Sequence, residues 1–138
     1  MFSRPPIFLF VLFLLAGCAG LKLSEGSAET LHQRAQEFWD ARVAGDLVTC
    51  YKYELNAKLK KMSLTDYIKS KGNLIYKTAK VLSVSLKDDS VAEVKVSLEY
   101  ALPAFGTSRI MKSIITEKWS KVDGVWYRQE EDKLKKSE

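Results

Sequence analysis

The sequence predicts one α+β domain in which helices come first and pack on a curved antiparallel four-stranded meander. Three observations predict it. Apolar residues have helical spacing between residues 29 and 72, the period changes to two after residue 76, and Asp-Gly and Asp-Asp-Ser turn signals separate strand-like segments. The 138 residues, 46% of them hydrophobic and 28% charged, suit one globular core and do not suit a disordered chain. Helices followed by consecutive strands favour helices on one face of a sheet.

An uncharged apolar run, Ile7 to Ala16, follows a start that carries the positive charge of Arg4. Ten residues rise about 15 Å as a helix, which is half the hydrocarbon thickness of a bilayer. The run is therefore too short to span a membrane and is typical of the apolar region of a secretory signal peptide.

The next residues, Leu15-Ala16-Gly17-Cys18, resemble the lipobox of bacterial lipoproteins. The resemblance implies that residues 1–17 are removed as a lipoprotein signal peptide and that two or three acyl chains on Cys18 anchor the protein to the lipid bilayer. The domain is then expected on the outer side of the cytoplasmic membrane. An Asp directly after the lipidated cysteine would resemble an inner-membrane retention signal, but this chain has Ala19 there. This difference favours the outer membrane facing the periplasm. A plain secretory signal followed by an incidental cysteine is the alternative.

Residues 19–28 contain glycine, serine and charges without periodicity, so we expect residues 18–28 to be the lipidated cysteine and a flexible tether of roughly 17 Å reach. Loss of Arg4 with the leader lowers the formal net charge from +5 to +4. Lysines and acids alternate from Lys22 to Lys136, and an exported protein does not meet nucleic acid. No nucleic-acid partner is therefore expected.

Helical spacing first appears between residues 29 and 44, where one stripe contains Leu31, Ala35, Phe38 and Trp39. Gly45 is expected to end this helix, and Asp46 to cap a second helix that continues through Leu55. A third, short helix is indicated over residues 63–72, capped by the serine at its first position.

Alternation with a period of two then predicts four strands, over residues 77–86, 92–102, 109–122 and 125–130. The first has Leu82, Val84 and Leu86 on one face, and the second has Val94, Val96, Leu98, Tyr100 and Leu102 on one face. Pairing Leu86 with Ala92 and Val84 with Val94 keeps these apolar faces together. Asp123-Gly124 joins the last two strands and is the strongest turn signal in the chain.

The segment Phe38-Trp39-Asp40-Ala41-Arg42-Val43-Ala44-Gly45-Asp46, followed by a short helix, resembles the opening of nuclear-transport-factor-2-like (NTF2-like) domains. The short helix at Ser63 and the closing Asp123-Gly124-Val125-Trp126 strand are similar to that superfamily too. The resemblance covers residues 29–131, implies a cone in which helices and a concave sheet enclose a pocket, and leaves residues 132–138 as a charged tail. These features are topological, so they imply a fold and no particular reaction.

Some members of that superfamily use Asp or Asp and His groups inside the pocket for isomerase or dehydratase chemistry. In this chain the only histidine, His32, lies at the edge of the apolar stripe, where a surface or capping role is expected. Asp40 lies about 180° from Leu31 on the helical wheel and is expected to face solvent. We therefore expect a non-catalytic domain. The alternative is a lyase or isomerase that uses an acid on the concave strands, such as Glu99 or Glu117.

Neither a metal nor a cofactor is expected. The sequence has no His-x-x-x-His, no Cys-x-x-Cys and no glycine-rich phosphate loop. Cys50 is the only cysteine besides Cys18, and it lies near Leu47 and Tyr51 on the apolar side of a helix. A buried, inert thiol is expected there, and a nucleophile or an intermolecular disulfide is the alternative.

Arg42 falls at about 20° on the same wheel, in the middle of the apolar stripe. A charge in that place needs a partner. Either Arg42 lies in the pocket and holds a ligand carboxylate or phosphate, or it pairs with a carboxylate of the sheet and with the last carbonyls of its helix. Four aromatic residues either line the same pocket or belong to the core: Trp39, Tyr51, Tyr100 and Trp119.

The third strand is apolar on both faces, with Ile110 and Ile114 on one and Met111, Ile115 and Trp119 on the other. Burial of one face does not explain this pattern, so the tail or a second subunit is expected to cover the outer face. NTF2-like domains often pair through their sheets, and the resemblance therefore implies a homodimer. We expect an envelope lipoprotein whose domain binds an envelope protein or a small amphipathic ligand; a structural spacer without a ligand is a further alternative.

Overall fold

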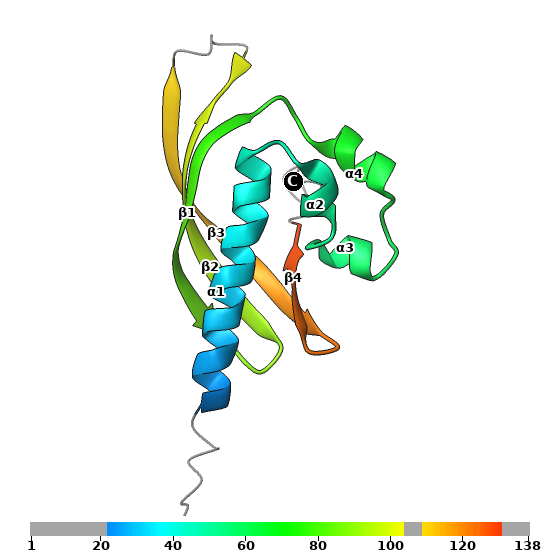
Figure 1. The fold of residues 1–138 in the computed structure, drawn as a ribbon, viewed down its shortest axis with the longest axis vertical. Coiled ribbons are helices and arrows are strands. Elements are labelled where there is room, and N and C mark those ends of the chain that lie inside the picture. The colour runs from blue at the N-terminus through cyan, green and yellow to red at the C-terminus, as the bar shows by residue number, and fades with distance from the viewer. Residues whose placement is uncertain (1–21, 104–108, 131–138) are drawn as a thin grey trace, which may run out of the picture.

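The computed structural model describes residues 22–103 and 109–130, and within them it has the predicted α+β architecture (Figure 1). The helices are α1 (Lys22–Val43), α2 (Leu47–Tyr51), α3 (Leu55–Lys58) and α4 (Leu64–Ser70). The strands are β1 (Ile75–Leu86), β2 (Val91–Ala101), β3 (Ile110–Val122) and β4 (Val125–Gln129). They form one antiparallel sheet in the order β1-β2-β3-β4, and the helices cover one face of it. No helix in the described ranges is long and apolar enough to cross a membrane.

Helix α1 begins at Lys22 rather than at residue 29 or 30, so the predicted tether is wrong for residues 22–28, which are helical. That stretch contains no proline, and extending a helix already held by packing costs much less than starting one. The predicted apolar stripe is confirmed, because its members are all buried against the sheet: Leu31, Ala35, Phe38 and Trp39.

The predicted boundary between the first two helices is confirmed. Gly45 adopts the left-handed conformation with φ of +75°. Its N–H donates to the Arg42 carbonyl at 3.2 Å, and the Asp46 N–H donates to the Ala41 carbonyl at 2.9 Å, which satisfies carbonyls at the end of α1. The Asp46 side chain then accepts from the Thr49 N–H at 3.0 Å and so caps α2.

The second predicted helix is wrong beyond Tyr51, because the chain becomes extended at Glu54, with φ of −80° and ψ of 136°. The Arg128 N–H donates to the Tyr53 carbonyl at 2.8 Å, so this short segment pairs with the edge of β4. Leu55 consequently starts a separate helix, α3. Here a hydrogen bond to the sheet overrides local helix propensity.

Two further local signals are confirmed. The Ser63 hydroxyl accepts from the Asp66 N–H at 3.1 Å and caps α4. Asp123 and Gly124 both have positive φ, 51° and 78°, as a two-residue type I′ hairpin turn requires. This turn joins β3 to β4.

The register of the first hairpin is also confirmed: Leu86 pairs with Ala92, and Val84 with Val94. One predicted side-chain direction is wrong, because a bulge follows Val81 and moves Leu82 to the solvent side, where it is 47% exposed. Strand β2 ends at Ala101, so Leu102 lies just outside the strand on which it was expected.

Helix α1 satisfies polar groups at both edges of the sheet. The Gln36 side-chain amide accepts from the Val81 N–H at 2.9 Å and donates to the Ala79 carbonyl at 3.0 Å on the edge strand β1. Arg34 Nε donates to the Trp126 carbonyl at 2.6 Å on the other edge strand, β4. The sheet therefore curves far enough around α1 for one helix to reach its first and last strands.

The inner face of β3 is buried and its outer face is not. Trp119 is fully buried, and Met111 and Ile115 are half-buried. On the outer face Ile110 and Ile114 are exposed, Ile114 by 66%. The tail that was expected to cover them, residues 132–138, lies outside the described residues, and cover by a second subunit stays a prediction.

Candidate ligand cavity and its buried polar network

A cavity of about 310 Å³ lies between the C-terminal half of α1, the end of α4 with the residues after it, and the inner faces of β3 and β4. This volume is at the lower end of the range found for small-molecule pockets, about 300–1,000 Å³. Part of its lining is apolar and aromatic: Phe38, Trp39, Leu74, Tyr76 and Ile115. Its charged lining residues are Arg42, Lys71, Glu117, Arg128 and Glu130.

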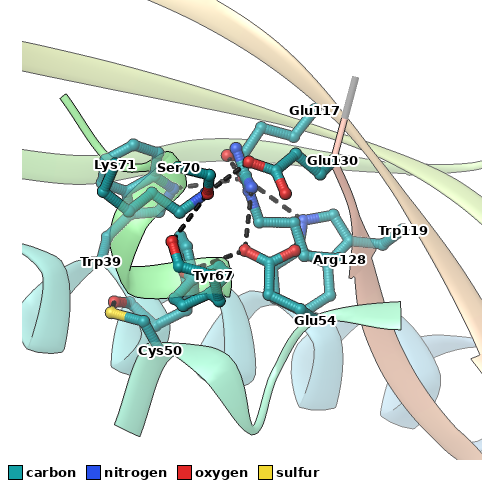
Figure 2. A network of polar contacts seen from close by, with 11 residues as sticks. Trp39, Cys50, Glu54, Tyr67, Ser70, Lys71, Glu117, Trp119, Arg128 and Glu130 are labelled. Carbon is teal, nitrogen blue, oxygen red and sulfur yellow. Dashed lines mark hydrogen bonds and ion pairs between the residues drawn. The ribbon is translucent and has the colours of Figure 1, made fainter. Parts of the chain in front are cut away.

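Arg128 is the centre of a polar network beside this cavity (Figure 2). Its Nε donates to Glu117 Oε1 at 2.6 Å, and its Nη1 donates to Glu54 Oε1 at 3.1 Å. The side chains of the two acids are only 3% and 2% exposed. Two carboxylates withdrawn from water are costly unless a cation compensates them, and Arg128 supplies that charge to both.

Glu117 lines the cavity and is held by three donors. Besides Arg128 on Oε1, the indole N–H groups of Trp39 and Trp119 donate to Oε2 at 3.2 and 3.3 Å. Charged and neutral donors on both oxygens fix the orientation of the carboxylate. Glu117 therefore has the position on the concave side of the sheet that the lyase or isomerase alternative requires.

Glu54, at the start of α3, is the more weakly satisfied acid. Its Oε1 accepts from the Tyr67 hydroxyl at 3.1 Å and from Arg128, but Oε2 has no hydrogen-bond partner among the described residues. Burial raises the pKa of the Glu54 carboxyl, and the nearby Arg128 charge opposes that rise. Burial also raises the pKa of Tyr67, which therefore stays a hydroxyl donor. Protonation of Glu54 relieves part of its desolvation cost as the pH falls.

An ion pair joins two sides of the cavity rim. Lys71, which follows α4, pairs with Glu130, which follows β4, and both side chains are largely buried. The Lys71 ammonium also lies 4.2 Å from the centre of the Tyr67 ring. The pair therefore connects the end of α4 to the end of the sheet, and the charges of Lys71 and Glu130 compensate each other.

Arg42 differs from the other two cations of the cavity. Its guanidinium carbon lies 5.2 Å from the centre of the Tyr76 ring, and within the described residues it has no ion pair or hydrogen bond. The expected alternative, pairing with a carboxylate of the sheet, is not seen in that part of the chain. Arg42 is half-buried and lines the cavity, which is the position that the ligand-binding alternative requires.

Of the four aromatic residues predicted to lie either in the pocket or in the core, only Trp39 lines the pocket. Tyr51 contacts the Tyr67 ring at 5.6 Å and donates its hydroxyl to the Met62 carbonyl at 2.6 Å, outside the lining. Tyr100 lies behind Tyr76, with 6.4 Å between the ring centres. Trp119 is core, and reaches the site only through its N–H on Glu117.

The remaining titratable candidates lie away from the cavity. Glu99 pairs with the exposed Lys112 at 3.0 Å on the outer face of the sheet, so its expected place on the concave side is wrong. His32 and Asp40 are exposed on α1, as predicted from the helical wheel. No cluster of potential metal ligands occurs in the part of the chain that the structure describes.

Cys50 is fully buried, as expected, and its thiol donates to the Phe38 carbonyl at 3.7 Å. Burial raises the pKa of the thiol to about 11. The predicted inert role therefore fits this environment better than a nucleophile does.

The sequence reading missed Arg128, Lys71 and Tyr76. A signal existed for Arg128, because alternation in β4 places it on the same face as the buried Trp126. Lys71 and Tyr76 were missed because the Glu130 partner of Lys71 and the Trp39 neighbour of Tyr76 are distant in the sequence.

No family model and no curated protein matches this chain. The fold is similar to the solution structure of a SEC-C motif-containing protein from Rhodopseudomonas palustris, with a TM-score of 0.55 and 13% sequence identity. The similarity covers 70% of this chain and 73% of that protein. At this identity it supports the α+β arrangement of helices on an antiparallel sheet and carries no information on function.

Proposed function

We propose that this protein is a bacterial envelope lipoprotein, anchored through an acylated Cys18, whose NTF2-like domain is a non-catalytic binding module. The anchor is supported by the Leu15-Ala16-Gly17-Cys18 sequence directly after a short apolar run. The module is supported by one observation above all: a cavity of about 310 Å³ that combines aromatic walls with convergent charged groups.

The anchor is tested by the intact mass of the protein purified from bacterial membranes. A chain that begins at Cys18 and carries a diacyl or triacyl mass is expected. The Cys18→Ser variant should leave the membrane fraction while its far-UV circular dichroism stays unchanged. Tight membrane association of that variant would contradict the lipidation proposal.

The proposed NTF2-like fold also suggests where a ligand would bind. Helices that precede a concave meander, with a cavity between them, agree with the cone that the resemblance implies. The cavity favours a small amphipathic ligand over a protein as the partner of this site, because its walls face inward. A protein partner or a second copy would instead use the exposed outer face around Ile114.

Two neighbouring isoleucines provide a matched test of the binding site. Ile115 lines the cavity and Ile114 points to the outer face. The protein would be incubated with an organic extract of bacterial envelopes and analysed by native mass spectrometry for bound small molecules. Ile115→Trp should fill the cavity and abolish the bound mass, whereas Ile114→Trp should retain it. Equal retention by both variants would rule out the cavity as the site.

A lyase or isomerase is the second candidate, and the observation that favours it is the buried carboxylate of Glu117 in the cavity wall. Both oxygens of Glu117 already accept hydrogen bonds, which suits a fixed anion better than a group that exchanges protons with a substrate. If the ligand found above is chemically converted, Glu117→Gln should stop conversion and leave binding intact. Recovery of the ligand unchanged after long incubation would favour the binding module.

A further inference from the structure

We propose that the cavity selects a small organic monoanion, whose oxyanion group pairs with Arg42 and whose apolar body packs on Tyr76, Leu74 and Ile115. This inference rests on the proposed function, since it names the class of ligand for the same cavity. It follows from the ion pairing around the cavity, from the donors that Arg42 leaves unused, and from the apolar wall beside it.

Ion pairing around the cavity leaves one cation without a partner, because two of the three acids share Arg128. Arg128 is compensated by Glu117 and Glu54, and Lys71 by Glu130. Within the described residues no carboxylate compensates Arg42. Arg42 is therefore the cation that can still form an ion pair with a ligand. A second negative charge would meet the Glu117 and Glu130 carboxylates in the same small cavity.

The geometry of Arg42 suits an oxyanion. Its guanidinium carbon lies 5.2 Å from the centre of the Tyr76 ring, a cation–π contact that forms no hydrogen bond with the N–H groups. The five N–H donors lie along the edge of the planar guanidinium group, and none donates to another described residue. A carboxylate, or another oxyanion with a single charge, can accept two of these N–H groups side by side.

The wall next to Arg42 is aromatic. The Trp39 and Tyr76 rings meet edge to face, with 5.2 Å between their centres, and Ile115 and Leu74 continue the apolar lining. Trp39 is already buried, so the part of this lining that an inorganic anion would leave uncovered comes from Tyr76, Leu74 and Ile115. A neutral apolar molecule would leave Arg42 without an ion pair. Flat or short aliphatic bodies fit because the cavity has only about 310 Å³.

The experiment uses the full chain, purified from bacterial membranes in a neutral detergent, and isothermal titration calorimetry at pH 7. The probes are 1-naphthoate, the uncharged 1-naphthalenemethanol, 1-naphthyl phosphate and inorganic phosphate. We expect 1-naphthoate to bind about tenfold to a hundredfold more tightly than the alcohol, as one charge-assisted Arg–oxyanion contact provides. Inorganic phosphate should not bind, and the naphthyl phosphate should bind no more tightly than the carboxylate.

Substitution then assigns the effect to one side chain. Arg42→Gln should reduce 1-naphthoate affinity to that of the alcohol and leave the alcohol affinity unchanged, which also shows that the variant is folded. Arg42→Lys should keep part of the preference. Lys80→Gln, which removes an exposed charge from β1, is the control and should change nothing.

The outcomes separate the two proposals. If the alcohol binds as tightly as the carboxylate and Arg42→Gln affects neither, selection of an anion is refuted and the binding cavity stands. Phosphate binding without an organic body would refute the role of the aromatic wall, and tenfold preference for the naphthyl phosphate would refute selection of a single charge. If none of the aromatic probes binds and the envelope extract yields no bound mass, the cavity as a ligand site is itself refuted.

Discussion

Replacement of Arg128 by methionine tests whether charge compensation stabilises the region around the cavity. The variant keeps most of the side-chain length and removes the only described cation that contacts the Glu54 and Glu117 carboxylates. A buried carboxyl without a cation avoids its charge by binding a proton. At pH 7, protonating a glutamate of ordinary pKa near 4.3 costs about 1.4 kcal/mol for each of about 2.7 pH units, or roughly 3.7 kcal/mol.

We expect one of the two acids to be protonated, while the other stays charged because its remaining hydrogen-bond donors stabilise it. The unfolding free energy at pH 7 should then fall by about 3–5 kcal/mol, as is usual when one partner of a buried pair is removed. The sign of the pH dependence follows. The folded variant binds a proton that the unfolded chain does not bind at pH 7, so its stability falls as the pH rises. At pH 5 the same protonation costs only about 1 kcal/mol, and most of the difference from the unaltered protein should disappear.

Urea unfolding, followed by tryptophan fluorescence at pH 5 and pH 7, measures both quantities. Arg42→Met is the matched control, because it makes the same change in the same cavity at an arginine with no described carboxylate partner. Losing its contact with the Tyr76 ring should cost less than about 1 kcal/mol, with no dependence on pH. A loss at Arg128 that is small, or equal at both pH values, would refute the reasoning.

Three further predictions concern single local features. Gly124→Ala should lower the unfolding free energy by about 1 kcal/mol in thermal unfolding, because φ is +78° there and open space around the added Cβ leaves only the backbone cost. A similar loss of about 1 kcal/mol is expected for Ser63→Ala, which removes the cap of α4; a change within error would show that the cap is dispensable. The Cys50 thiol, with its pKa raised to about 11, should resist a disulfide thiol reagent at pH 8 and react promptly in urea, and rapid reaction of the folded protein would contradict its burial.

Much of the fold could be predicted because its signals are local. Gly45 and Asp46 end one helix and start the next through contacts within a few residues, and Asp123-Gly124 needs only its own backbone to turn the chain. Strand alternation then fixes the register, since a slip by one residue would turn every apolar side chain of the hairpin to solvent.

The errors occur where distant residues decide the local geometry. Glu54 leaves the helical conformation because the carbonyl of Tyr53 accepts a hydrogen bond from the N–H of Arg128 in β4, 75 residues later in the chain. No property of the segment itself indicates this contact. Leu82 turns outward because β1 accommodates one extra residue against β2. Alternation alone cannot place such a bulge.

The candidate site shows the same division. Arg42 and Trp39 could be identified because a helical wheel shows a charge inside an apolar stripe, and both line the cavity. Arg128 could not be given its role, because its acids come from two other elements of the fold. Tyr51 and Tyr100 have the residue type that lines pockets, but their backbone positions face other neighbours.

The reach of α1 to both edge strands has a consequence for how the protein can fail. Gln36 and Arg34 lie two residues apart, yet one occupies polar groups of β1 and the other a carbonyl of β4. If α1 detaches, both margins of the sheet lose these contacts together and become templates for strand pairing with other chains. A mutation that detaches this single helix, rather than one in either edge strand, would then promote aggregation most directly. Other chains could add strands to both edges of the sheet at once.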